Sequence, residues 1–336
     1  GSEAQGPPAG LRRLTAVSSR TRASAALALV TVLMAALCAC SGPSPRSLLR
    51  SIDDGAVLIG VKADQPGLGL RGGDGEYSGF DIDVARYVVR TVAAARGKGE
   101  PKITWRESPT PQRERLIDNG EVDAIVASYS IDSARATEVA FAGPYLTTRQ
   151  GLLVRRDEAA VGTVSDLGRD RTLCSVAGST SARSVAALLP GVRSIEYDSY
   201  SACADALARR AVDAVTTDEV ILAGFAAQRP DAFRLVDMVL PKDTCVDGRL
   251  RSAGAPFSVE RYGIGLAHGD AAARDAVNAA LRQMLESGEW ERSLRRAVGD
   301  EEAARTIERD GGTDRLVPGI GDLGFLSATS APCAAR

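Results

Sequence analysis

Arg135 stands shortly after a polar run from Ser128 to Ser130 that follows a predicted strand. A guanidinium group can hold a carboxylate through two parallel hydrogen bonds, which a lysine ammonium group cannot do. Ser130 is placed to assist. Judged by spacing alone, however, a solvated helix arginine or an interlobe ion pair is the better interpretation of Arg135.

A second candidate anion site lies at Gly178, Ser179 and Thr180, which follow a predicted strand over residues 172–176 and begin a helix. Backbone N–H groups at the start of a helix attract anions, and glycine lets the backbone approach a ligand closely. Thr180 could thus hold the same carboxylate as Arg135. The serine and threonine could also simply cap the helix, and the two roles are compatible.

Asp218 ends another predicted strand. An acidic group in that position can balance the ammonium group of a ligand, aided by carbonyl groups near Ser128. The alternative is that Asp218 only caps the helix predicted over residues 219–225.

Two further cations follow strands. Lys62 comes just after the first predicted strand, and Arg113 follows a strand over residues 103–106 and a Ser-Pro-Thr-Pro loop. If both point into one cleft, they would neutralise a side-chain carboxylate and disfavour basic ligands. Each of them taken alone is more often a surface charge.

Short apolar runs alternate with helical patterns along the chain. The run over residues 56–61 suits a buried strand, and Val84, Val88 and Val92 then recur at helical spacing. This alternation predicts an α/β protein with a largely parallel sheet. One helix is expected near residues 271–294, and a weakly periodic peripheral tail is expected beyond Gly299.

The chain repeats a pattern of helix end, turn, strand and polar cluster over residues 116–128 and again over residues 207–218. Ligands of open α/β sheets bind at the carboxyl ends of strands. Two lobes with a cleft between them are therefore predicted. The alternative is that the shared Val-Asp-Ala segment is a chance strand motif.

Composition excludes several classes of function. The net charge of -2 argues against a basic nucleic-acid binder, and 4% aromatic residues argue against base-stacking surfaces. His268 is the single histidine, which excludes a multi-histidine metal site, and its Gly-rich surroundings predict a surface turn. No metal site and no cofactor are expected.

The N-terminal segment resembles a secretory signal. Arginines precede an apolar run over residues 23–37, which is short for a membrane span, and Leu-Cys-Ala-Cys follows. This ending resembles a bacterial lipobox with Cys40 as the acylated cysteine; the alternative is an ordinary signal with incidental cysteines. Residues 41–54 are expected to form a tether. Cys174, Cys203, Cys245 and Cys333 remain, an even number in an oxidising compartment.

Several segments together resemble one family. They are residues 79–85 (Gly-Phe-Asp-Ile-Asp-Val-Ala), 119–123 (Asn-Gly-Glu-Val-Asp), 141–145 (Phe-Ala-Gly-Pro-Tyr) and 262–266 (Tyr-Gly-Ile-Gly-Leu). This set resembles the polar amino-acid-binding solute receptors of ABC importers. Residues 62–70, 105–109 and 321–326 are similar in particular to actinobacterial glutamate-binding lipoproteins. The resemblance covers roughly residues 55–327.

The resemblance implies a fold, a ligand and partners. The fold would be two α/β lobes of the type II periplasmic-binding-protein kind, joined by two crossover strands around a cleft. The segments would be a lipoprotein signal (1–40), a tether (41–54), lobe 1 (55–148), lobe 2 (149–260), a return to lobe 1 (261–300) and a tail (301–336). The protein would be a monomer, held on the outer face of the cytoplasmic membrane by lipid, that delivers glutamate or a related amino acid to a permease.

The resemblance also assigns roles to residues. Arg135 and Ser130 would hold the α-carboxylate, with Thr180 from the second lobe; Asp218 and carbonyls near Ser128 would bind the ammonium group; Lys62 and Arg113 would face a side-chain carboxylate. It further implies a disulfide between Cys174 and Cys203. Cys245 and Cys333 depart from the family pattern and are left to pair with each other.

Two other classes of function share this fold. A dehydratase-like enzyme would need a catalytic dyad, nucleophile elbow or metal cluster, and the sequence offers none, so no catalytic residue is assigned. A sensor that signals to a membrane partner would use the same ligand-driven closure. The sequence does not separate sensing from transport.

Overall fold

The computed structural model describes residue 1, residues 44–246 and 248–309, and residues 313, 316 and 333. The chain divides into two compact units, residues 1–44 and 45–336, and the elements below belong to the second. The predicted signal segment, Cys40 and most of the predicted tail lie outside the described residues.

The main sheet contains nine strands in the described part of the chain, in the order β5-β1-β6-β14-β7-β10-β8-β9, with β11 also paired to β7. Its strands are β1 (Ala56–Val61), β5 (Lys102–Glu107), β6 (Ala124–Ile125), β7 (Ala140–Arg155), β8 (Thr172–Val176), β9 (Arg193–Tyr197), β10 (Ala214–Asp218), β11 (Phe233–Asp237) and β14 (Val259–Leu266). Small sheets are formed by β2 (Asp64–Gln65), β3 (Gly69–Arg71) and β4 (Tyr77–Ser78), and by β12 (Thr244–Val246) and β13 (Arg249–Arg251).

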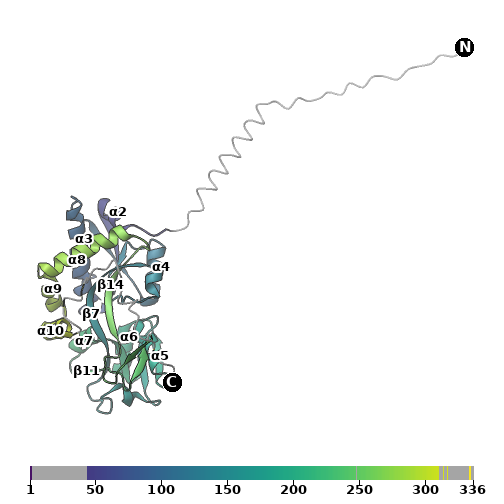
Figure 1. The fold of residues 1–336 in the computed structure, drawn as a ribbon, viewed down its shortest axis with the longest axis vertical. Coiled ribbons are helices and arrows are strands. Elements are labelled where there is room, and N and C mark those ends of the chain that lie inside the picture. The colour runs from purple at the N-terminus through teal and green to yellow at the C-terminus, as the bar shows by residue number, and fades with distance from the viewer. Residues whose placement is uncertain (2–43, 247, 310–312, 314–315, 317–332, 334–336) are drawn as a thin grey trace. The chain divides into compact units, whose positions relative to one another are not determined.

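Strands β7 and β14 join two halves of this sheet. They pair antiparallel from Val259 opposite Arg149 to Leu266 opposite Ala140. On one side β14 pairs with β6, which continues to β1 and β5; on the other, β7 pairs with β10, which continues to β8 and β9. Figure 1 shows β7 and β14 side by side through the middle of the fold. The predicted two-lobed α/β fold with two crossover strands is confirmed, and we call the β1 side lobe 1 and the β8 side lobe 2.

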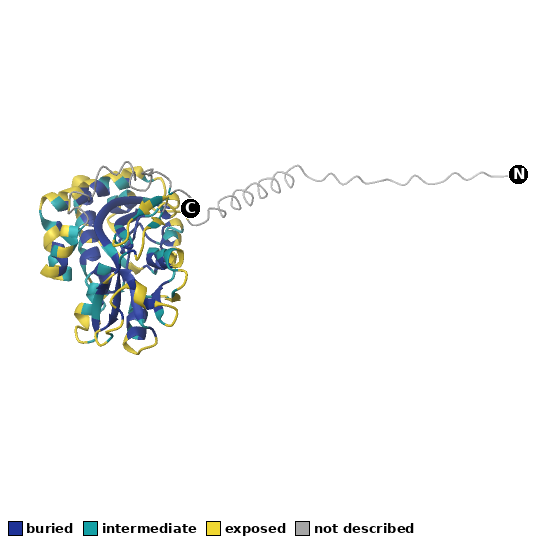
Figure 2. Cartoon of the chain, turned by 60° about the horizontal axis from the view of Figure 1, so that its bottom comes forward, coloured by how far each residue is buried: buried dark blue, intermediate teal, exposed yellow. Residues whose placement is uncertain are grey.

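Helices cover both halves of the sheet. They are α2 (Leu48–Asp53), α3 (Phe80–Ala95), α4 (Arg113–Asp118), α5 (Thr180–Leu188), α6 (Tyr200–Ala208), α7 (Glu219–Gln228), α8 (Ala271–Glu286), α9 (Glu289–Val298) and α10 (Asp300–Glu308). The apolar face of α3, with Val84, Val88 and Val92, is buried in the core, as its helical spacing predicts. Figure 2 shows buried residues concentrated in the strands and in the inner faces of the helices.

The repeated sequence pattern forms the same local structure in both lobes. The backbone N–H of Asp123 donates to Leu58 O (2.7 Å), and Asp123 Oδ2 accepts from Leu58 N (2.7 Å). In lobe 2, Asp213 makes the matching pair with Thr172, at 2.8 Å in each direction. The repeat is therefore structural, because each aspartate fixes its strand against the neighbouring strand of its own lobe.

The expectations for the C-terminal region were wrong in two places. The single helix expected near residues 271–294 is two helices, α8 and α9, because the chain turns at Gly288 with φ 71°. The tail expected beyond Gly299 begins with a helix. This helix, α10, starts at Asp300, and its Ala303 is buried against the core. Acidic residues in the first turn of α10 favour its start.

The predicted disulfides are present. Cys174 of β8 is bonded to Cys203 of α6, and Cys245 of β12 is bonded to Cys333. The first fastens a helix to the centre of lobe 2. The second ties the C-terminal end of the chain to the β12–β13 hairpin.

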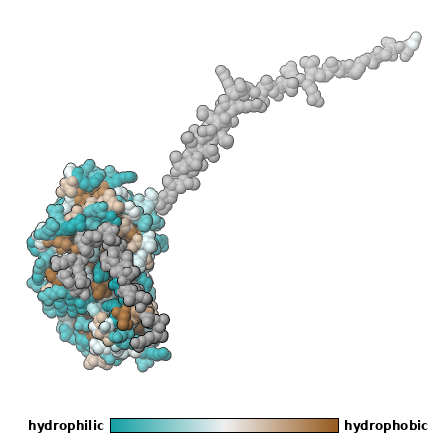
Figure 3. Space-filling model, in the orientation of Figure 1, coloured by the Kyte–Doolittle hydropathy of each residue, from teal (hydrophilic) through white to brown (hydrophobic). Residues whose placement is uncertain are grey.

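The surface of the described region is mostly polar. On the face shown in Figure 3, hydrophilic residues cover most of the coloured area. His268 lies exposed in a turn, as predicted. A search of the described residues finds no helix with the length and apolarity needed to cross a membrane.

Candidate functional site

Two adjoining cavities lie where the strands of both lobes end. The inner cavity, of about 20 Å³, is lined by Thr110, Arg113, Ser128, Ser130, Arg135, Ser179, Thr180, Ser181, Tyr200, Thr217, Asp218 and Ile221. The outer cavity, of about 380 Å³, is lined by Lys62, Asp64, Gln65, Glu107, Ser108, Pro109, Thr110, Pro111, Gln112, Val176, Asp198, Ser199 and Tyr200. Thr110 and Tyr200 line both. Every ligand-binding residue expected from the sequence therefore lines one of these cavities, Lys62 the outer and the others the inner.

Arg135 begins a short 3₁₀ turn in lobe 1 and is buried. Its guanidinium donates to Ser130 O (2.8 Å) and, across the cleft, to Gly178 O (3.0 Å). Its Nε lies 3.4 Å from a carboxylate oxygen of Glu114, so part of its charge is paired. The solvated-arginine interpretation is wrong because Arg135 is buried, and its ion pairs in the described part of the chain, with Glu114 and Asp132, lie within lobe 1 rather than between the lobes.

Arg113 is the first residue of α4 and is also buried. Its guanidinium lies over the Tyr129 ring, 4.2 Å from the centroid, and donates to Ala127 O (3.1 Å). Burial, followed by the nearby charge of Arg135, lowers the pKa of Arg113 to about 10. Its Nε is buried without a hydrogen-bond partner among the described residues. Leaving a buried donor without an acceptor costs free energy, which favours a ligand that brings an acceptor to this Nε.

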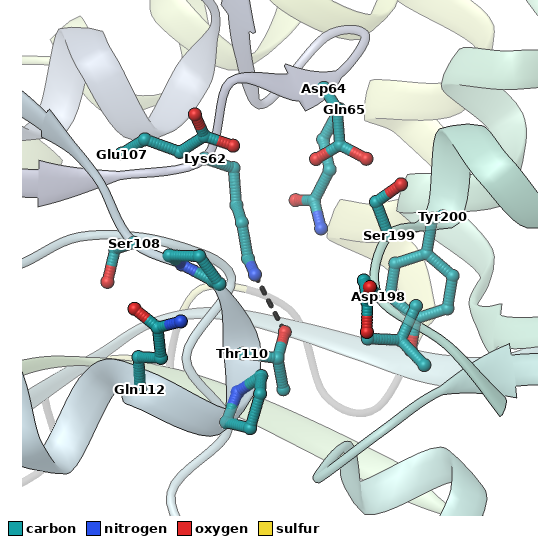
Figure 4. A pocket seen from close by; sticks show the side chains of 13 residues that line it. Lys62, Asp64, Gln65, Glu107, Ser108, Thr110, Gln112, Asp198, Ser199 and Tyr200 are labelled. Atoms are coloured by element: carbon teal, nitrogen blue, oxygen red, sulfur yellow. Dashed lines mark hydrogen bonds between the residues drawn. The ribbon is translucent and has the colours of Figure 1, made fainter.

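Lys62 follows β1 and points into the outer cavity, where its Nζ donates to Thr110 Oγ1 (2.7 Å) (Figure 4). It is buried, so the surface-charge interpretation is wrong. Burial, followed by the charge of Arg113, lowers the pKa of Lys62 to about 7. The side chain of Tyr200 lies on the lobe 2 side of the same space (Figure 4).

Ser128 has a left-handed backbone, with φ 44°. Its N–H donates to Asp81 Oδ2 (2.8 Å) and its hydroxyl donates to Gln65 Oε1 (2.9 Å). Asp81 lies in the first turn of α3 and also accepts from Tyr145 Oη (2.8 Å). These bonds hold a strained residue at the edge of the inner cavity.

Thr180 is the first residue of α5, which begins after β8 as the sequence predicts. Ser179 caps the helix, because its hydroxyl oxygen accepts from Ala182 N (3.0 Å). Thr180 and Ser181 line the inner cavity beside this helix end. The capping role and the placement for anion binding occur together, as the sequence allowed.

Asp218 ends β10 and is buried. It precedes α7, but its side chain makes no capping hydrogen bond, so the capping interpretation is wrong. Its Oδ2 accepts a hydrogen bond from Tyr262 Oη, whereas Oδ1 is buried without a partner among the described residues. Burial, followed by the charge of Glu260, raises the pKa of Asp218 well above its usual range.

Sequence reasoning missed the residues that support this site. Asp81 was not proposed as a site residue, yet its carboxylate accepts a hydrogen bond from Ser128 N and holds Ser128 in place. Tyr200, Thr110 and Gln65 line the cavities without having been proposed. Thr110 and Gln65 follow predicted strands closely, which is a signal that could have identified them.

The cavities combine anion-binding and cation-binding groups. Arg113 and Arg135 lie on one side, and the unpartnered Asp218 Oδ1 lies on the lobe 2 side. Within the described ranges, no group of three or more His, Cys, Asp and Glu side chains is arranged to hold a metal ion. The arrangement can bind a small molecule that carries both a carboxylate and an ammonium group.

A two-lobed fold with a polar site between the lobes is typical of solute-binding proteins. Residues 57–300 match the family described as bacterial extracellular solute-binding proteins, family 3, and the chain belongs to this family. The resemblance found in the motifs is confirmed.

Curated relatives agree with this assignment. The chain is 44% identical over 317 residues to the glutamate-binding protein GluB of Corynebacterium glutamicum, covering 94% of this chain and 100% of the relative. It is 46% identical over 307 residues to the glutamate-binding protein GluB of Corynebacterium efficiens, covering 91% and 97%. A solved solute receptor for L-cysteine of Neisseria gonorrhoeae shares the fold, with a TM-score of 0.65, 20% identity, and coverage of 81% of this chain and 99% of that one.

Proposed function

We propose that this chain is an extracellular receptor that captures an acidic amino acid, with glutamate preferred, for an ABC importer. The observation that carries the proposal is the unpartnered, buried Asp218 Oδ1 in a cavity that also contains Arg135 and Arg113. A zwitterionic ligand supplies the ammonium group and carboxylate that such a site needs once water is excluded. The GluB relatives, whose names state glutamate binding, support the same ligand.

Each predicted residue then has a defined task. Arg135, Ser130 and Thr180 bind the α-carboxylate, Asp218 and the backbone of Ser128 bind the ammonium group, and the distal carboxylate lies toward Lys62 and Arg113. An inner cavity of about 20 Å³ holds little more than one water molecule. The lobes must therefore separate to admit an amino acid, and the ligand carboxylate takes the place of Gly178 O on Arg135.

The ligand is tested by isothermal titration of the purified chain with a panel of the common amino acids. Glutamate should bind most tightly, aspartate and glutamine more weakly, and arginine and lysine least. Tightest binding of arginine or lysine would contradict the acidic ligand but not the amino-acid site. Incubation with each ligand followed by mass analysis tests the expectation that none is chemically converted.

We further propose that Cys40 is acylated and begins the mature protein, which is held at the membrane as a monomer. The supporting observation is the lipobox-like Leu-Cys-Ala-Cys sequence. Mass spectrometry of the mature N-terminus should find a lipid-modified Cys40, and an unmodified N-terminal residue would contradict the proposal.

A further inference from the structure

Tyr262 lies on the crossover strand β14 and is fully buried. Its hydroxyl donates a hydrogen bond to Asp218 Oδ2, the last residue of β10. The other oxygen of Asp218 has no partner among the described residues, although it is buried and Asp218 lines the inner cavity. One oxygen is thus anchored by the chain while the other is left for a ligand.

The surroundings of Asp218 oppose its ionised form. Glu260 is buried nearby on the same strand β14, where its carboxylate accepts from Ser258 Oγ (2.8 Å), and its charge adds to the burial of Asp218. The Tyr262 hydrogen bond and the charges of Arg135 and Arg113 act in the opposite direction. A carboxylate meant to bind an ammonium group must be both charged and correctly turned, and Tyr262 contributes to both requirements.

We propose that Tyr262 is a positioning residue for ligand recognition, which fixes Asp218 with Oδ1 facing the inner cavity for the α-ammonium group of the ligand. This inference rests on the proposed function, since it assumes that Asp218 binds that group. It places part of the recognition machinery on a strand that joins the lobes, outside the set of residues that line the cavities.

The neighbouring crossover strand provides a matched control. Tyr145 of β7 is also fully buried, lies with its ring centroid 6.2 Å from that of Tyr262, and donates from its hydroxyl to Asp81 Oδ1 (2.8 Å). Asp81 does not line the inner cavity, and its other oxygen is occupied by Ser128 N. Tyr145→Phe therefore removes the same chemical group from the same kind of pair without touching Asp218 or its hydrogen bond from Tyr262.

The test is a double-mutant cycle with L-glutamate as the probe, measured by titration up to millimolar concentrations. Tyr262→Phe should weaken glutamate binding about tenfold to a hundredfold, as expected for losing a hydrogen bond to a charged group. In an Asp218→Ala background the same change should cost less than about twofold, because Tyr262 no longer has an acceptor to hold. Tyr145→Phe should change glutamate affinity by the same factor in the wild-type background and in the Asp218 variant.

The outcomes separate the two proposals. Equal losses from Tyr262→Phe in both backgrounds would overturn the positioning role. If Asp218→Ala alone leaves glutamate affinity unchanged, the proposed ammonium site fails instead. Circular dichroism and thermal unfolding of each ligand-free variant check that it folds.

A second variant keeps the test open if Tyr262→Phe does not fold. Incorporation of 3-fluorotyrosine at position 262 preserves the shape and the hydroxyl but gives a more acidic donor. The stronger hydrogen bond should lower the pKa of Asp218, so glutamate binding should persist to lower pH than in the wild type. The groups facing Asp218, namely Glu260, Tyr200, Arg113 and Arg135, are unchanged by this substitution. If glutamate binding is lost over the same acidic pH range as in the wild type, the proposal is overturned.

Discussion

Arg135 donates to Gly178 O on the opposite lobe, and we propose that a ligand carboxylate takes the place of this acceptor. Arg135→Ala should weaken every amino-acid ligand, by about 2–5 kcal/mol for a buried charge pair that loses one partner. Titration with glutamate, glutamine and aspartate measures this loss. Arg115→Ala, an exposed arginine on α4, is the control and should leave all three affinities unchanged. A loss confined to one ligand would contradict an α-carboxylate role.

Lys62 and Arg113 should act on the side chain of the ligand instead. Replacing each with Met keeps apolar volume but removes the cation that we propose faces the distal carboxylate. Glutamate should lose two to three factors of ten in affinity, about 3–4 kcal/mol, while glutamine should change little. Titration of both ligands against both variants measures the difference. Equal losses for glutamate and glutamine would make these residues structural.

The lowered pKa of Lys62 predicts a pH dependence with a definite sign. Only the protonated amine of Lys62 attracts the distal carboxylate. In the free protein this protonated form predominates at pH values below the Lys62 pKa of about 7. A bound carboxylate raises that pKa, so glutamate affinity should be full below about pH 7 and fall above it, by up to about tenfold per pH unit. Titrations between pH 6 and 8.5 should show this fall for glutamate but not for glutamine. Lys62→Met should abolish it.

At this scale the sequence predicted the residues that line the cavities better than the residues that support them. Arg135, Thr180 and Asp218 follow strands or begin helices, and the edge of an α/β sheet gathers such positions at one place. Asp81 and Tyr262 were missed as site residues because their partners, Ser128 and Asp218, are distant in the chain. No local sequence pattern indicates a contact between residues so far apart in the chain.

At the scale of elements, the predicted strands at residues 56–61 and 172–176 match β1 and β8. Buried strands are recognisable because they are short apolar runs with turn residues on both sides. The break at Gly288 was not predicted, since apolar residues keep helical spacing on both sides of it and one glycine is tolerated within many helices.

The Cys174–Cys203 bond joins an element of the sheet to the helix α6, whose first residue Tyr200 lines both cavities. Replacing both cysteines with Ala should lower the free energy of unfolding by about 3–4 kcal/mol, from the loop entropy of a 29-residue separation. Denaturant unfolding under oxidising conditions measures the change. An unchanged free energy of unfolding would show that the disulfide constrains neither the folded nor the unfolded state.

At the scale of the molecule, several contacts between residues of the chain hold the two lobes together. Asp64 of β2 accepts from the backbone N (3.1 Å) and the hydroxyl (3.0 Å) of Ser201 in the first turn of α6, where a negative charge also suits the helix dipole. Arg183 of α5 pairs with Asp132 of lobe 1 across the same cleft. Because these contacts bridge the cleft, we expect them to favour the closed arrangement of the lobes.

Asp64→Ala should therefore weaken all amino-acid ligands by one common factor, about three- to tenfold, because its contacts with Ser201 also stabilise the lobes when they close over any bound ligand. Selectivity between glutamate and glutamine should not change. Small-angle scattering should find the ligand-free variant more expanded than the wild type and the two equally compact at saturating glutamate. Asp118→Ala, at an exposed position on α4, is the control and should alter neither affinity nor size. A loss specific to one ligand would place Asp64 in direct recognition rather than in closure.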